Sequence, residues 1–126
     1  LKHIRRPGKV IILSDFLIPP PSYERGLNLL RSLNLDISVI QVLSRPELDP
    51  PFPIGNLIVV DTENEAETKV QWTAHSRTEY QERLQHHNRQ LKSFCHQAGI
   101  DLSLYVTDQK VSEFILQTLP TIGLFK

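Results

Sequence analysis

Lys9-Val10-Ile11-Ile12-Leu13-Ser14-Asp15-Phe16 is the stretch of sequence that decides the fold. It is a short apolar run, rich in β-branched side chains, and such a run is typical of a parallel strand that is buried on both faces. Asp15 follows at the carboxyl end of this strand, where open α/β sheets bind ligands and metals. We therefore take Asp15 as the first candidate site residue, with a turn former or helix cap as the alternative interpretation.

The rest of the chain alternates segments with strand and helix periodicity. Pro19-Pro20-Pro21 predicts a stiff loop, and the prolines between residues 44 and 54 predict a stretch without regular structure. The first predicted helix is 22–33, which Ser22 caps and Asn34 ends. The second is 76–98, with a capping box of Ser76 and Glu79 at its start and Gly99 at its end. The third is 110–119, and its inward side chains are expected to be Val111, Phe114, Ile115 and Leu119. The predicted strands are 37–43 and 102–106, with a β-hairpin formed by 57–61 and 68–73. This order predicts an α/β fold, a parallel sheet of about three strands with helices and a β-hairpin.

Composition limits the class of protein. A chain of 126 residues with 40% hydrophobic residues supports one core. Lys and Arg number 14, as do Asp and Glu, so the charge balance favours neither nucleic acid nor an anionic membrane as a partner. Cys95, the single cysteine, is expected to be a buried thiol in a reducing, cytoplasmic compartment. Because the chain has no methionine, we expect it to be a piece of a longer protein.

Enzyme chemistry at Asp15 would need partner residues. A haloacid-dehalogenase-type phosphatase needs a second Asp two positions on, where Leu17 stands, and a receiver domain needs an acidic pair before Asp15. A nucleophile elbow at Ser14 needs glycines where Ile12 and Phe16 stand. His86 and His87 are adjacent and point to different sides of a helix, so we interpret His87 as a core-edge side chain with one hydrogen bond.

Several segments resemble one bacterial family. The likeness begins with Arg5 to Leu17 and continues through Gln41-Val42-Leu43, Pro46-Glu47-Leu48, Phe52-Pro53, Leu57 to Glu65, Tyr80, Arg83-Leu84, His87 and the segment around Cys95 and Gly99. In this succession the chain resembles domain-of-unknown-function family 58, a group similar to the von Willebrand factor A domain.

The resemblance implies a Rossmann-like, von Willebrand A-type sheet with a metal-ion-dependent adhesion site. Such a site combines an Asp-x-Ser-x-Ser motif, a Thr and a later Asp, and Asp15 matches the later Asp. The first two elements have no counterpart, so residues 1–126 resemble the carboxyl-terminal half of the domain, from the fourth strand to the last helix. No cofactor is then expected in this chain alone, while Asp15 and Ser14 would join the Mg²⁺ ligands of the intact domain. Ile18 departs from the acidic residue that family members often have there.

The resemblance also implies partners. Members of the family are typically encoded beside MoxR-type AAA ATPases, serve complex assembly or maturation, and often come from membrane-anchored parents. The favoured hypothesis is a non-enzymatic protein-interaction domain that docks such an ATPase or its client, without nucleic acid or membrane contact by this chain. The alternative is a hydrolase or phosphotransfer enzyme that uses Asp15. The half domain that the chain resembles lacks the strand that would pair with residues 10–14 on one side. Because this leaves an unpaired edge, we also expect a homodimer through that edge.

Overall fold

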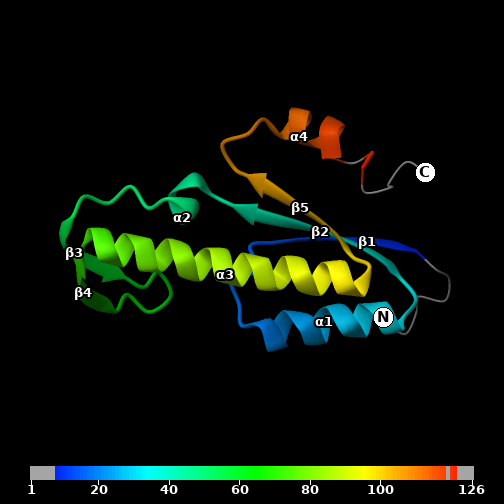
Figure 1. The fold of residues 1–126 in the computed structure, drawn as a ribbon, viewed down its shortest axis with the longest axis horizontal. Helices are drawn as coiled ribbons and strands as arrows, with labels where there is room; N and C mark the ends of the chain where they lie inside the picture. The colour runs from blue at the N-terminus through cyan, green and yellow to red at the C-terminus, as the bar shows by residue number, and fades with distance from the viewer. Residues whose placement is uncertain (1–7, 119, 122–126) are drawn as a thin grey trace.

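The fold is known from a computed structural model, which describes residues 8–118 and 120–121 (Figure 1). Along the chain the elements are β1 (Lys9–Ser14), α1 (Pro20–Ser32), β2 (Asp36–Leu43), α2 (Arg45–Leu48), β3 (Gly55–Val60), β4 (Glu67–Trp72), α3 (Ala74–Ala98), β5 (Asp101–Val106) and α4 (Val111–Thr118).

The three strands β1, β2 and β5 form a parallel sheet in the order β1-β2-β5. Helices α1 and α3 cover one face, and α4 lies on the other side beside β5 (Figure 1). The pair β3 and β4 forms a separate antiparallel hairpin. The predicted α/β class, with three parallel strands and a hairpin, is confirmed.

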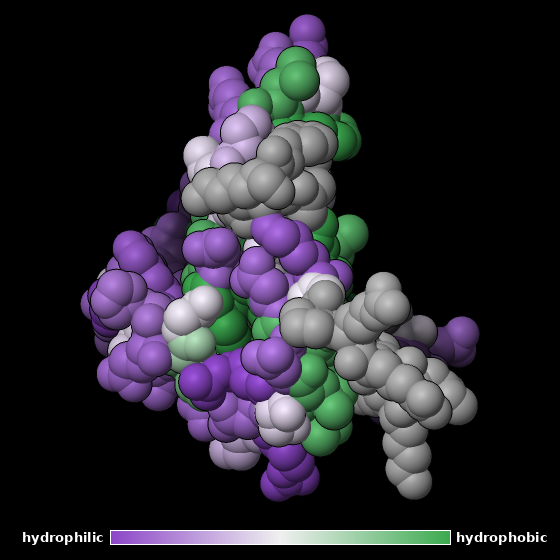
Figure 2. All heavy atoms as spheres, turned by 90° about the vertical axis from the view of Figure 1, so that its right-hand side faces the viewer, coloured by the Kyte–Doolittle hydropathy of each residue, from purple (hydrophilic) through white to green (hydrophobic). Residues whose placement is uncertain are grey.

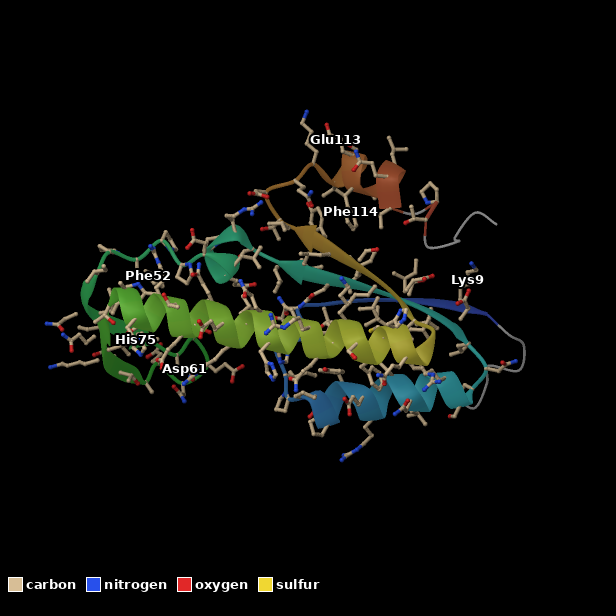
Figure 3. All side chains as sticks on the ribbon, in the orientation of Figure 1. Lys9, Phe52, Asp61, His75, Glu113 and Phe114 are labelled. Atoms are coloured by element: carbon tan, nitrogen blue, oxygen red, sulfur yellow. The ribbon has the colours of Figure 1, made fainter. Side chains whose placement is uncertain are left out.

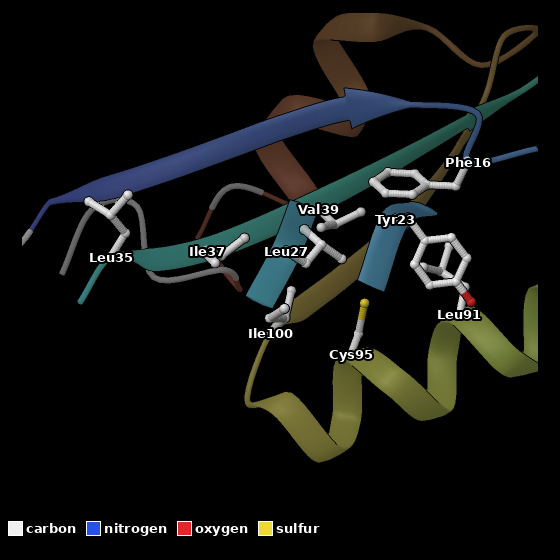
Figure 4. Close-up of a cluster of buried hydrophobic side chains, with 9 residues drawn as sticks. All are labelled: Phe16, Tyr23, Leu27, Leu35, Ile37, Val39, Leu91, Cys95 and Ile100. Atoms are coloured by element: carbon white, nitrogen blue, oxygen red, sulfur yellow. The ribbon is translucent and has the colours of Figure 1, made fainter. Parts of the chain in front are cut away.

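The core lies between β2 and the two helices. Val39, Leu91 and Cys95 are almost fully buried at its centre, and the T-shaped ring pair of Phe16 and Tyr23 closes one end (Figure 4). Ser38 and Ile40, on the opposite face of β2, are buried as well. A central parallel strand covered on both faces explains why β2 reads as a nearly continuous apolar run. The burial predicted for both faces of β1 is wrong, because β1 lies at the edge of the sheet and only its Val10 and Ile12 face packs on the core, so its residues alternate between exposed and half-buried.

The hairpin is anchored at the amino-terminal end of α3. The Trp72 ring on β4 makes edge-on contacts with Phe52 at 6.2 Å and with Tyr80 of α3 at 6.4 Å between centroids. Val70 and Trp72 are half-buried, whereas Lys69 and Gln71 are exposed, as the alternation of this arm predicts.

Two predicted helix starts are wrong. Helix α1 begins at Pro20 after Pro19, and Ser22 makes no cap, because proline fits the first helical turn, where an N–H has no helical partner. Helix α3 is capped by Thr73, whose hydroxyl oxygen accepts a hydrogen bond from Ser76 N–H, so the Ser76 cap was placed one turn late. The predicted stops hold, since Asn34 and Gly99 both have left-handed backbone.

The predicted irregular stretch 44–54 contains a short helix. Ser44 caps α2 by accepting a hydrogen bond from Glu47 N–H, and the Glu47 carboxylate accepts one from Ser44 N–H, which makes a capping box around Pro46. Arg45 then pairs with Asp108 beyond β5, with N···O distances of 3.0 and 3.3 Å. This guanidinium lowers the pKa of the Asp108 carboxyl below its usual value.

The inward face predicted for the last helix is largely wrong. Val111 and Ile115 are exposed, and Leu119 lies outside the described residues. Phe114 alone is half-buried, with its ring 4.8 Å from that of Tyr105. Figure 3 places Phe114 on the side of α4 that faces β5 and Glu113 on the other. A helix of 8 residues beside an edge strand covers only one of its own apolar side chains.

The surface of the described residues is mixed. From the end where β1 begins, Figure 2 shows polar side chains interrupted by hydrophobic patches. Within the described ranges, no helix is long and apolar enough to cross a membrane.

Burial of Cys95 gives a testable pH dependence. Desolvation raises the pKa of this thiol from 9.0 to about 11, so the folded state keeps a proton that the unfolded chain releases. The free energy of unfolding should therefore fall between about pH 9 and pH 11. Urea denaturation across this range measures the slope, and Cys95→Ala should show a shallower one. Equal slopes in both proteins would contradict a buried thiol.

Candidate functional site

The predicted site residues Ser14 and Asp15 both hold the loop that leaves β1. Ser14 Oγ accepts a hydrogen bond from Phe16 N–H at 3.0 Å, and Asp15 Oδ1 accepts one from Leu17 N–H at 2.9 Å. These are the short-range contacts by which Ser and Asp shape turns. The Asp15 carboxylate is exposed, and its position at the carboxyl end of β1 agrees with the prediction.

Phe16 fixes the direction of this loop. Its φ is 54°, a left-handed backbone that is rare for a bulky residue and costs about 1–3 kcal/mol. Two contacts hold it there. The Phe16 ring is buried against Tyr23, with 6.0 Å between centroids, and the Phe16 carbonyl accepts a hydrogen bond from His87 Nε2 of α3 at 2.5 Å. His87 is thus a core-edge histidine with one hydrogen bond, as predicted.

A buried side-chain amide on β2 connects the same loop to β2 and to α3. Gln41 is only 4% exposed, and its Nε2 donates to the Asp15 carbonyl at 3.2 Å and to Asn88 Oδ1 at 2.9 Å. Both amide hydrogens therefore have acceptors, which offsets the cost of burying the group. Sequence analysis missed Gln41 and Asn88. The position of Gln41 inside the otherwise mostly apolar strand 37–43 was the feature that could have indicated a buried hydrogen-bonded amide.

A recess lies between this loop and the middle of α3. Its volume is about 460 Å³ and its lining comprises Leu17, Ile18, Pro19, Tyr80, Arg83, Leu84 and His87. Leu17 and Ile18 remain 42% and 45% exposed. The Tyr80 hydroxyl donates to the Glu47 carbonyl at 2.6 Å, which ties the far wall to α2.

Arg83 is the one formally charged residue in this lining. It is exposed and makes no ion pair with any described residue. Its guanidinium is therefore available to a carboxylate beside the apolar lining, in a geometry that suits two-point binding.

The residues described do not form a complete metal site. Within residues 8–118 and 120–121, no group of three or more His, Cys, Asp or Glu side chains is placed to hold an ion. Ser14 and Asp15 supply only two side-chain oxygen ligands, and both groups already accept hydrogen bonds from backbone N–H groups of the loop. Mg²⁺ needs near-octahedral oxygen coordination. The proposal that they bind Mg²⁺ in an intact domain stays a prediction.

Comparisons with known proteins give no match. The chain fits no protein-family model, and no curated protein or solved structure is significantly similar to it. The geometry of the chain is therefore the ground for any functional proposal.

The turn contact of Asp15 can be tested by substitution. Asp15→Ala removes the acceptor for Leu17 N–H and should lower the free energy of unfolding by about 0.5–1.5 kcal/mol. Asp15→Asn keeps a side-chain oxygen and should stay within about 0.5 kcal/mol of the wild type. Chemical denaturation measures both changes. An equally large loss in the Asn variant would show that the carboxylate charge, rather than the turn, is what matters.

Proposed function

We propose that this chain is a non-enzymatic protein-interaction domain that docks a partner on the recess between residues 15–19 and α3. The observation that carries the proposal is the fixed presentation of two exposed aliphatic side chains, Leu17 and Ile18, by a loop held at consecutive carbonyls. Binding loops supported by a rigid scaffold lose little conformational entropy when a partner docks. Exposed aliphatic groups of this kind supply the apolar anchor points of protein interfaces.

The lining indicates the chemistry of the partner. An apolar recess with one guanidinium at its rim suits a peptide segment that carries an aliphatic or aromatic side chain next to an Asp or Glu. The apolar side chain would enter beside Leu17 and Leu84, and the carboxylate would meet Arg83. A segment with Lys or Arg in the same place would be rejected by the Arg83 charge.

The resemblance to family 58 extends this proposal to a partner. On that resemblance the fold is a von Willebrand A-type half domain, and the partner is a MoxR-type AAA ATPase or its client. The parallel order β1-β2-β5, with Asp15 after an edge strand, agrees with this assignment at the level of topology. Hydrolysis or phosphotransfer through Asp15 is the alternative function.

Selection from a random-peptide phage library tests the recess. We expect the enriched peptides to share an apolar residue beside Asp or Glu. Leu17→Asp and Arg83→Glu should each weaken the binding of a selected peptide by about tenfold or more, because each removes a central contact. Arg89→Glu, an exposed change on the same helix outside the lining, is the matched control and should bind like the wild type.

Two results would contradict the proposal. If the selected peptides bind the Leu17→Asp and Arg83→Glu variants with the affinity they have for the wild type, the docking site lies elsewhere. Turnover of generic phosphate or ester substrates that is lost in Asp15→Asn would instead favour the enzyme alternative.

A further inference from the structure

The strand β1 is an edge of the sheet with little protection against another strand. Among residues 8–118 and 120–121, only β2 pairs with it. Val10 to Leu13 contain no charge, no proline and no glycine, which are the residues that usually protect an edge. The opposite edge differs, since β5 carries the polar side chains Asp101, Ser103 and Tyr105.

The outer face of β1 is apolar as well. Val10 and Ile12 pack against the core, so the alternating residues Ile11 and Leu13 point to the face away from α1 and α3. Ile11 is 38% and Leu13 is 66% exposed. From Val10 to Leu13 this strand has no second strand beside it among the described residues, and it carries two exposed aliphatic side chains. It therefore offers both backbone hydrogen bonds and apolar area to a partner strand.

We propose that a second copy of this chain pairs antiparallel with β1 about a two-fold axis at Ile12. Opposite residues of an antiparallel pair share a face, so this register sets Ile11 beside the partner's Leu13 and Leu13 beside the partner's Ile11. The resulting sheet has six strands, with the helices α1 and α3 of both copies on the same side.

Charge complementarity selects this register. Continued one residue past the end of β1, the same pairing sets Lys9 opposite the partner's Asp15, once at each end of the paired strands. Figure 3 shows Lys9 near the start of β1. Lys9 also lies 3.5 Å from Asp36 in its own chain, so the partner's Asp15 would join an ion pair that is already present. A shift by two residues would set Lys9 or Asp15 against an aliphatic side chain of the partner.

A one-residue shift is excluded by the faces of the sheet. It would set the core-facing Val10 and Ile12 opposite residues of the outer face, and so carry the partner's helices to the other side. The exposed pair Ile11 and Leu13 would then lose its symmetric apolar contact.

Sedimentation equilibrium of the whole chain tests the proposal. We expect a reversible dimer, which Leu13→Lys weakens by about tenfold or more because it sets a charge against the partner's Ile11. Leu29→Lys, an exposed change on α1, is the control and should leave association unchanged. Circular dichroism checks that both variants are folded.

Carbodiimide coupling of the wild-type chain tests the register without any substitution. In a mixture of ¹⁴N- and ¹⁵N-labelled protein, mass spectrometry should find an isotopically mixed cross-link between Lys9 and Asp15. A monomer at high concentration, a dimer unaffected by Leu13→Lys, or mixed cross-links without this pair would each overturn the proposal. These outcomes are separate from peptide binding at the recess, so either proposal can fail alone.

Discussion

The buried amide of Gln41 is the contact on which the carboxyl edge of the sheet depends. A Gln in the central strand cannot be hydrated, so its two N–H groups need acceptors inside the protein. They find the Asp15 carbonyl after β1 and the Asn88 side chain on α3. One side chain thus fixes the loop, the strand and the helix relative to one another. Losing either acceptor would leave an unpaired buried donor, at a cost of about 1–3 kcal/mol.

Helix α3 extends this constraint along the molecule. Its 25 residues cover about 37 Å at 1.5 Å per residue. Its first turns meet Trp72 of the hairpin through Tyr80, its middle holds the loop through His87, and its last turns bury Leu91 and Cys95 in the core. The recess lies along the section of this helix from Tyr80 to His87, where contacts with Trp72 and with the Phe16 carbonyl hold the helix.

The sequence predicted most of the elements that depend on apolar pattern, but it failed for the two-face burial of β1 and for the inward face of α4, where the apolar side chains find too little of the protein to cover them. It also failed where a single contact decides. The parallel strands, the hairpin, the buried face of α3 and the stop at Gly99 follow from periodicity and from the left-handed preference of glycine. The cap at Thr73 and the helix around Pro46 were missed, because neighbouring Ser, Thr and Pro residues offer competing starts. Asp15 was placed correctly at the strand end. Its contact with Leu17 N–H is the local turn that was the alternative interpretation of Asp15. The left-handed Phe16 was not predicted, because the contacts that hold this loop come from His87 and Gln41, which are distant in sequence.

The central claim is that residues 15–19 form a fixed platform rather than a mobile loop. Backbone ¹⁵N relaxation of Leu17 and Ile18 tests it most directly, because these two amides belong to the exposed residues of the recess. The account predicts order parameters of about 0.85 in the wild-type protein, equal to those of α3. They should decrease clearly in Gln41→Leu, because this substitution removes the buried hydrogen-bond donor. Order parameters below about 0.6 in the wild-type protein would contradict it.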